Sequence, residues 1–272
     1  LKLASSPVST PQICVEPKLK SLALQTDGRC LVLGDGYILN LEQKQKTRIL
    51  TTLPTRWKQG VVAINQGKQM IAAAQATSTV YLVNIDTGKV LRKLEGEGHS
   101  IHCLAFSDSG KLLASGNTYS YRDKGADVYV WDVSDGELMH QFAGHQKTVL
   151  SLAFESKERM LASGDEEGKF QVWDLASGKL LFVATRSGQI STLAFDPDGK
   201  LLAVGTSKKY RSKGVIVIED VHSGKTIVNL EVSDGVLKAM FTADGRKLLA
   251  ICKDGKVYLW DVETTEFSTA QQ

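Results

Sequence analysis

The feature that most limits how this chain can fold is a repeat with a period of just over forty residues. Apolar runs typical of strands end at corresponding points along the chain, at intervals of 44, 48, 42, 46 and 41 residues. The residues that anchor these runs are Leu39, Val83, Trp131, Trp173, Glu219 and Trp260. Six units of this length occupy nearly all of the 272 residues, so little chain is left for a second domain.

Residues 127–154 show the pattern of one unit most clearly. Residues 128–133 alternate as a strand, Ser134-Asp135-Gly136 is a turn signal, and residues 138–142 alternate again. Residues 149–154 are too continuously apolar to have a solvent face, so we expect this run to be buried on both sides. The unit therefore predicts short strands joined by turns, and no long helix is expected anywhere in the chain.

Three of the six runs close on a tryptophan–aspartate pair, at Trp131-Asp132, Trp173-Asp174 and Trp260-Asp261. A period in the forties closed by such a pair resembles the WD-repeat family of β-propellers, and the resemblance covers nearly the whole chain. It implies an all-β, single-domain propeller over residues 1–272, with six four-stranded blades and seven blades as the alternative. For function the resemblance implies little, because this fold is reused for many partners.

The expected repeats span residues 19–50, 61–94, 100–142, 148–183, 190–230 and 236–270. Six blades are favoured over seven because only six anchors are found and residues 1–18 are too short for a blade. We expect residues 8–14 to supply the outer strand of the last blade, which would leave no sheet edge open between the first and last blades. Residues 266–270 are the alternative source of that strand.

The resemblance also implies a structural role for several polar residues. In the family, a histidine before the first strand, a serine or threonine, an aspartate and the tryptophan form a buried hydrogen-bonded set. His145, Ser163 and Trp173 match this set, with Glu167 standing where aspartate is usual. His99, Ser115 and Trp131 match it too, but the acid position falls in a long loop. The expected structural residues are His99, Ser115, Trp131, Asp132, His145, Ser163, Trp173, Asp174, Trp260 and Asp261.

A catalytic role for these serines and histidines is not expected. A nucleophile needs an exposed, activated hydroxyl beside an oxyanion pocket, whereas these serines are predicted to lie inside a sheet. His99 and His102 form an isolated HxxH at a loop-to-strand junction, where the two side chains would not share a helical face. We therefore predict no enzyme activity, no metal site and no cofactor.

Composition excludes some classes of protein. The net charge of +3 is too small to indicate a nucleic-acid binder, and no apolar run approaches the 18 residues of a membrane span. Hydrophobic residues at 42% and charged residues at 23% are ordinary for a soluble protein. Four cysteines, at positions 14, 30, 103 and 252, lie far apart without a CxxC pair, so we expect buried free thiols. Free thiols favour a reducing compartment, and we expect the cytoplasm.

Functional information is expected where one repeat departs from the others. The two longest intervals contain insertions between the second and third strands, at residues 117–127 and 206–214, and both carry the pattern Tyr-Arg-x-Lys-Gly. Connections of this kind emerge on the same side of the ring as the loops between blades, where Trp57 is also expected. Tyrosine, tryptophan and arginine are typical of recognition surfaces. The predicted partner-binding residues are Trp57, Tyr121, Arg122, Lys124, Tyr210, Arg211 and Lys213.

Two simpler explanations remain open for these basic residues. A tyrosine stacked on its neighbouring arginine would stiffen a long hairpin without any partner. On the opposite face every repeat carries a basic residue after its first turn, which is habitual in the family and typical of solvated hairpins. The leading hypothesis is a non-enzymatic module that binds another protein or a peptide. The alternative is a binder of nucleic acid or polyphosphate through the same basic residues.

Overall fold

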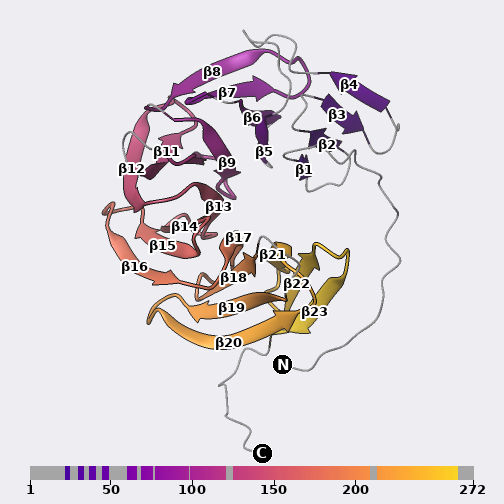
Figure 1. Cartoon of the computed structure of the whole chain (residues 1–272). Coiled ribbons are helices and arrows are strands. Elements are labelled where there is room, and N and C mark those ends of the chain that lie inside the picture. The colour runs from indigo at the N-terminus through magenta and orange to yellow at the C-terminus, as the bar shows by residue number, and fades with distance from the viewer. Residues whose placement is uncertain are drawn as a thin grey trace, which may run out of the picture.

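The computed structural model describes residues 22–24, 30–33, 37–40, 45–48, 60–65, 69–75, 77–97, 99–120, 125–208 and 213–262. These residues form 23 β-strands in six antiparallel sheets, and they contain no helix that could cross a membrane. The sheets follow one another around a centre in chain order (Figure 1). The predicted all-β propeller fold is confirmed.

The first three sheets have four strands each, and each strand pairs with the next one along the chain. Their strands are β1 (Leu22–Leu24), β2 (Cys30–Leu33), β3 (Tyr37–Asn40) and β4 (Gln45–Arg48); β5 (Val61–Asn65), β6 (Met70–Ala74), β7 (Thr79–Asn84) and β8 (Val90–Glu95); and β9 (Ile101–Phe106), β10 (Leu112–Asn117), β11 (Ala126–Asp132) and β12 (Leu138–His145).

The next two sheets also have four strands, and the last has three among the described residues. Their strands are β13 (Val149–Phe154), β14 (Met160–Asp165), β15 (Lys169–Asp174) and β16 (Leu180–Thr185); β17 (Gln189–Phe195), β18 (Leu201–Ser207), β19 (Gly214–Asp220) and β20 (Lys225–Val232); and β21 (Val236–Phe241), β22 (Lys247–Cys252) and β23 (Val257–Asp261). Both candidates for a further outer strand, residues 8–14 and 266–270, lie outside the described residues.

Each repeat anchor lies in the third strand of its sheet. Trp131, Trp173 and Trp260 pair with Leu113, Leu161 and Leu248 of the second strands, and all three tryptophans are buried. A shift of register falls next to the anchor in four of the sheets, where the third strand meets the fourth. Such a bulge bends the strand just before the chain turns back.

The turn after the anchor is built by a repeated local device. The Asp174 Oδ1 atom accepts a hydrogen bond from the backbone N–H of Ser177 at 2.7 Å, and Gly178 completes the turn with φ of 70°. Asp132 and Asp220 accept equivalent bonds from nearby serines. The side chains of Asp132, Asp174 and Asp220 thus fix the hairpins between third and fourth strands. In the last sheet, Asp261 pairs with Lys247 across two strands.

The apolar core lies in layers between neighbouring sheets. One layer joins Leu161 and Trp173 of the fourth sheet to Val130 and Phe142 of the third. The Phe142 and Trp173 rings stack with centroids 4.6 Å apart. Because each layer belongs to two sheets, a tryptophan of one repeat is buried by the repeat before it.

Glycines on the second strands let neighbouring sheets approach closely. A Cβ atom on Gly164 of β14 would lie 2.4 Å from the Ile190 Cγ2 atom of β17, and one on Gly116 would lie 2.5 Å from Val149 Cγ1 of β13. Any larger side chain would push the next sheet away. Glycine therefore sets the spacing between successive sheets near the centre of the ring.

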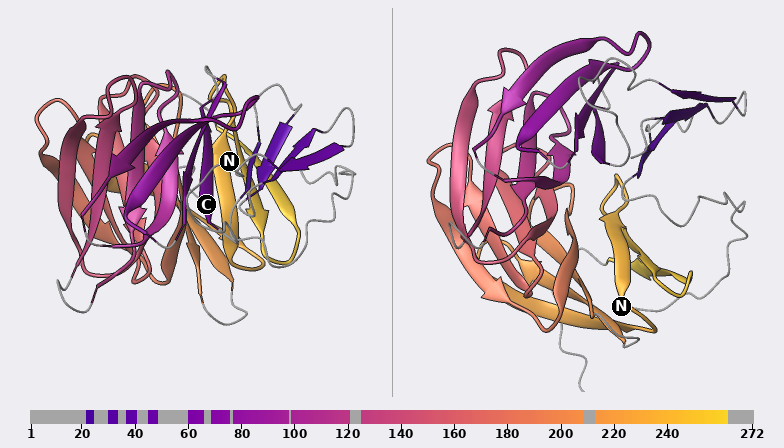
Figure 2. Two further views of the ribbon diagram at one scale, coloured as in Figure 1. Left: turned by 90° about the horizontal axis from the view of Figure 1, so that it is seen from above. Right: turned by 45° about the horizontal axis from the view of Figure 1, so that its top comes forward.

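The alternating strand directions give the ring two different faces (Figure 2). We call one the turn face; it carries the turns between first and second strands and between third and fourth strands. We call the other the loop face; it carries the connections between sheets and the connections between second and third strands. Both insertions found in the sequence leave and re-enter the sheets at the loop face.

Candidate interaction surface

Most of the predicted partner-binding residues lie outside the residues that the structure describes: Trp57, Tyr121, Arg122, Lys124, Tyr210 and Arg211. Lys213 is described. The structure therefore locates the bases of the two insertions, at the end of β10 and the start of β11, and at the end of β18 and the start of β19.

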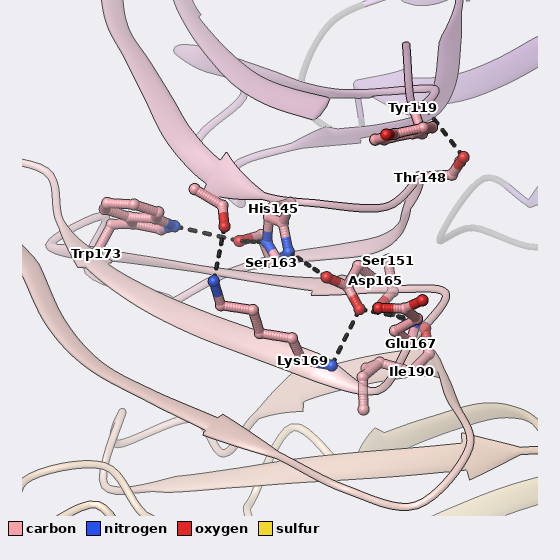
Figure 3. A network of polar contacts seen from close by, with 11 residues as sticks. Tyr119, His145, Thr148, Ser151, Ser163, Asp165, Glu167, Lys169, Trp173 and Ile190 are labelled. Carbon is pink, nitrogen blue, oxygen red and sulfur yellow. Dashed lines mark hydrogen bonds and ion pairs between the residues drawn. The ribbon is translucent and has the colours of Figure 1, made fainter. Parts of the chain in front are cut away.

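The base of the first insertion is tied to the following sheet. Ser120 and Gly125 form an isolated β-bridge across it. The backbone N–H of Tyr119 donates to the Thr148 Oγ1 atom, in the connection to β13, at 3.1 Å (Figure 3). The chain therefore enters the first insertion from a point held by two consecutive blades.

Two charged residues stand beside this base. The Lys147 Nζ atom lies 5.3 Å from the centre of the Tyr119 ring, and it pairs with the Glu167 Oε1 atom at 3.2 Å. The Lys147 and Glu167 side chains are 39% and 63% exposed, so both face solvent. Tyr119 and Lys147 are not among the residues predicted from the sequence. The only signal was an aromatic residue at the start of an insertion, outside the repeated five-residue pattern.

At the base of the second insertion, Lys213 is paired rather than free. Its Nζ atom lies 2.9 Å from the Glu231 Oε2 atom of β20, and both side chains are largely exposed. The hydrogen bond from Lys213 to Glu231 raises the pKa of that lysine. The described lysines at both insertion bases therefore stand beside carboxylates, and this part of the loop face is mixed in charge.

The polar set of the fourth sheet is complete (Figure 3). The Trp173 indole donates to Ser163 Oγ at 3.1 Å, and Ser163 Oγ lies 2.8 Å from His145 Nε2. His145 Nδ1 lies 2.9 Å from the Asp165 Oδ2 atom. With Nδ1–H donating to the carboxylate, Nε2 is left to accept the Ser163 hydroxyl proton.

The acid of this set is Asp165, so the prediction that placed Glu167 there was wrong. Asp165 follows Ser163 by two residues, and alternate residues of a strand face the same side. Its Oδ1 atom also accepts from the backbone N–H groups of Glu167 and Lys169, at 2.9 and 3.0 Å. Asp165 thus holds the tight turn after β14, while Glu167 points to solvent and pairs with Lys147.

This set is structural in its geometry. His145, Ser163 and Asp165 are each at most 1% exposed, and the Ser163 hydroxyl is bonded on both sides. A substrate carbonyl has no access to a serine in this position. Within the described residues, no three His, Cys, Asp or Glu side chains are grouped so that they could hold a metal ion.

The matching residues of the third sheet do not complete the same set. Ser115 Oγ is buried and, among the described residues, has no hydrogen-bond partner. Trp131 instead stacks on Tyr129, with ring centroids 5.7 Å apart. The position that Asp165 fills in the fourth sheet is held in the third by Asn117, the last residue of β10, whose buried side-chain amide also has no hydrogen-bond partner among the described residues. His99 is only partly buried, whereas His145 is buried.

In the fifth sheet a buried ion pair takes the place of the tryptophan. Glu219 is fully buried, and its Oε1 atom accepts from Arg186 Nε at 3.1 Å and from Arg186 Nη2. Thr226 Oγ1 donates to Glu219 Oε2 at 3.1 Å. The Arg186 guanidinium lies over the Phe170 ring of the fourth sheet, 5.5 Å from its centre. The sequence shows the substituted anchor but gives no signal for its partner, which precedes it by 33 residues.

Comparisons with known proteins agree with this architecture. A family model described as "Nucleolar protein 10-like, N-terminal domain" matches residues 20–189, and one described as "WD domain, G-beta repeat" matches residues 178–211. One chain of a structure described as "Crystal Structure of Mitotic Checkpoint Complex" superimposes with a TM-score of 0.71 at 20% identity, covering 89% of this chain and 73% of that one. That likeness concerns the fold alone.

Two relatives show how far the sequence similarity extends. Protein ROOT INITIATION DEFECTIVE 3 of Arabidopsis thaliana is 25% identical over 209 residues, covering 74% of this chain and 48% of that protein. Periodic tryptophan protein 2 homolog of Schizosaccharomyces pombe is 32% identical over 94 residues, covering 34% of this chain and 10% of that protein. The matched part of this chain thus spans less than half the length of either relative.

Proposed function

Because this chain belongs to the Nucleolar protein 10-like N-terminal domain family of WD-repeat β-propellers, we propose that it is a non-enzymatic module that binds a protein or peptide. WD-repeat propellers are generally scaffolds for protein interaction. The proposed binding surface is on the loop face, and its residues are Trp57, Tyr121, Arg122, Lys124, Tyr210, Arg211 and Lys213.

The observation that carries this proposal is the fixed base of the first insertion. Tyr119 is bonded to Thr148 in the connection to β13 and lies beside Lys147, so the base of the insertion has a defined place on the loop face. A fixed base reduces the conformational entropy that a loop loses on binding. Long hairpins that only needed stiffening would not require a tie to the neighbouring blade.

The charges at the insertion bases favour a protein partner over a polyanion. Lys147 is matched by Glu167, and Lys213 by Glu231. A surface for nucleic acid or polyphosphate is expected to present unpaired cations, because binding depends on neutralising phosphates. A protein surface, which carries both signs of charge, fits alternating lysines and carboxylates better.

The proposal is tested with the quadruple variant R122S/K124S/R211S/K213S. We expect its melting curve to stay unchanged, since removing exposed charges normally alters stability by less than about 0.5 kcal/mol. Partners recovered by affinity capture with the unmodified domain are identified by mass spectrometry, and the binding of each purified partner is then titrated. We expect binding to weaken by at least about tenfold in the variant, because interface arginines often contribute 2 kcal/mol or more.

A matched control removes four positive charges from the turn face. The variant K89S/K111S/K179S/R246S changes exposed residues and keeps the same net charge as the test variant. It should bind as the unmodified domain does. Equal binding by all three proteins would contradict the proposed surface, and a steep loss of binding with rising salt in every case would favour the acidic-ligand alternative.

Location in the cytoplasm is a separate proposal. It rests on the free thiols Cys103 and Cys252. The family description, in contrast, names a nucleolar protein. Cell fractionation with an antibody against this domain decides between cytoplasm and nucleolus.

A further inference from the structure

A repeated contact joins the outer strand of one sheet to the turn face of the next. In the second sheet it is made by Arg92, the third residue of β8. The Arg92 Nη2 atom donates to the Ser134 backbone oxygen at 2.9 Å, and Nη1 donates to the Asp135 oxygen. The arginine stem lies against Gly136, where a Cβ atom would be 2.5 Å from Arg92 Cδ.

The third sheet makes a related contact with a different donor, to the carbonyl at the position of Val133 and not to those at the positions of Ser134 and Asp135. His140 is the third residue of β12, and its Nε2 atom lies 2.7 Å from the Leu175 backbone oxygen of the following turn. Its ring lies against Gly178, which corresponds to Gly136. At both junctions a side-chain nitrogen from the outer strand therefore forms a hydrogen bond with a backbone carbonyl oxygen in a turn of the next sheet.

The fourth sheet breaks this rule. The third residue of β16 is Phe182, whose ring lies against Gly224 in the corresponding turn. Phenylalanine has no donor. Within the described part of the chain, no side chain donates to the backbone oxygens of Val221, His222 or Ser223, the counterparts of the oxygens bound by Arg92 and His140.

A groove opens at this junction. It has a volume of about 880 Å³ and is lined by Phe182 and by the turn from Val221 to Gly224. The carboxylates of Asp174, Asp198 and Asp220 also line it. The groove lies on the turn face, opposite to the surface proposed for the main partner.

The cations of the groove do not fill the position of the missing donor. Arg159 is bonded to the fully buried Glu155 at 3.3 Å, and Lys200 lies 3.6 Å from Asp198. Lys157 also lines the groove, and neither it nor the other two bonds a carbonyl of the turn after β19. The groove thus offers an aromatic ring and backbone oxygens that no described side chain bonds. It also holds three carboxylates, of which Asp174 and Asp220 accept hydrogen bonds from Ser177 and Ser223 and Asp198 faces Lys200.

We propose that this groove binds an arginine side chain of a protein partner. The guanidinium lies over the Phe182 ring and donates to the carbonyl oxygens of His222 and Ser223, as Arg92 does to Ser134 and Asp135 two junctions earlier. Arginine fits this role because its planar group can stack on an aromatic ring while its N–H groups bond acceptors at the edge. The contact of Arg92 with the turn after β11 shows the proposed hydrogen bonds within this protein.

The test uses the full chain labelled with ¹⁵N and three acetylated peptides, Gly-Leu-X-Leu-Gly, in which X is arginine, citrulline or glutamate. Citrulline keeps the shape of arginine and removes its charge. We expect the arginine peptide to shift the amide resonances of His222, Ser223 and Gly224. The citrulline peptide should bind at least about tenfold more weakly, because charge-assisted hydrogen bonds are roughly twice as strong as neutral ones.

A variant at Phe182 tests whether the peptide binds in the groove or elsewhere on the surface. F182R places an arginine in β16 at the position that Arg92 holds in β8. The introduced guanidinium should occupy the groove, so the arginine peptide should no longer shift the amide resonances of His222, Ser223 and Gly224. The melting temperature should stay unchanged. V183R is the matched control, because Val183 is exposed on the same strand but does not line the groove. It should bind the arginine peptide normally.

Three results would overturn the proposal. One is the absence of shifts at His222–Gly224 with the arginine peptide at millimolar concentration. Another is tighter binding of the glutamate peptide, which would assign the groove to acidic segments through Lys157, Arg159 and Lys200. The third is unchanged binding by folded F182R. None of these results affects the proposal for the loop face, whose residues lie on the other side of the ring.

Discussion

At the scale of single residues, a chain of hydrogen bonds runs from the Trp173 indole to the backbone of a turn. It passes through Ser163 and His145 to Asp165, which in turn holds the N–H groups of Glu167 and Lys169. Buried polar groups of this kind are costly when one partner is removed, because the remaining groups stay desolvated. The set therefore couples the sheet core to the conformation of a loop-face turn.

We expect Asp165→Asn to destabilise the protein by about 1–3 kcal/mol. The buried carboxylate accepts hydrogen bonds through both oxygens, whereas an asparagine amide has only one oxygen that can accept. Glu167→Gln should change stability by less than about 0.5 kcal/mol, since the glutamate is exposed. Urea unfolding followed by tryptophan fluorescence measures both. A larger loss of stability for Glu167→Gln than for Asp165→Asn would contradict the assignment of Asp165 as the acid of the buried set.

The thiols give a second prediction at this scale. Burial raises the pKa of Cys103 to about 12 and that of Cys252 to about 11. Both should stay protonated in the folded protein at pH 8, so reaction with Ellman's reagent should be slow until urea is added. Rapid labelling of either thiol in the native protein would contradict this expectation.

The same thiols predict how stability depends on pH. An unfolded cysteine ionises near pH 8.5, so above this pH the unfolded state loses protons that the folded state keeps. The contribution of Cys103 to the free energy of unfolding is therefore fully present below about pH 8.5 and falls as the pH rises toward 12. The stability difference between the unmodified protein and Cys103→Ala should accordingly shrink between pH 8 and pH 10.

At the scale of elements, the fifth sheet replaces a tryptophan by a buried ion pair. Glu219 has no exposed surface, whereas Arg186 is 24% exposed and lies over Phe170 of the preceding sheet. The pair therefore joins two blades where other junctions use aromatic packing. A buried carboxylate depends strongly on its partner, because an unpaired charge in the interior is far more costly than a missing apolar contact.

We expect Arg186→Leu to destabilise the protein by on the order of 3 kcal/mol, because it leaves Glu219 unpaired. The double variant R186L/E219L should be more stable than R186L alone, since it removes the stranded charge. Chemical unfolding of both single variants and the double variant completes the cycle. Additive effects would mean that the two residues act independently.

The sequence predicts the local elements of this fold but not the contacts between blades. Strands, turns and anchors follow from local patterns, whereas the arrangement of the sheets as a propeller and the structural role of the tryptophans are implied by the resemblance to WD-repeat propellers. The Asp165 bond, the Arg186–Glu219 pair and the Phe182–Gly224 contact at the groove depend on neighbouring blades, and they join residues 20, 33 and 42 positions apart. Periodicity carries no signal for such contacts, and one sequence does not show which position of a turn supplies the acid.

At the scale of the whole molecule, the last sheet shows three strands among the described residues, with β23 at its outer edge. A strand edge with unpaired backbone groups invites association with other chains. The predicted outer strand at residues 8–14 would close the ring by joining the two ends of the chain. Residues 266–270 would complete the sheet without joining them.

Deletion of residues 1–16 distinguishes these two arrangements. If residues 8–14 pair with β23, the deletion should lower the melting temperature and cause self-association, because it exposes the edge of the last sheet. Light scattering after gel filtration measures the association. Deletion of residues 265–272 is the control and should have little effect. The opposite pattern would assign the strand to residues 266–270.

The close approach at Gly116 and Gly164 has a consequence for how the protein is made. Each glycine is covered by a valine or isoleucine from the first strand of the next sheet, so no blade completes its own interior. During synthesis, the fourth blade stays uncovered on one side until Ile190 has left the ribosome. We expect a chain truncated before β17 to be cut by protease in the fourth blade, and one truncated after β18 to be protected there. The ring would thus assemble one blade behind its own translation.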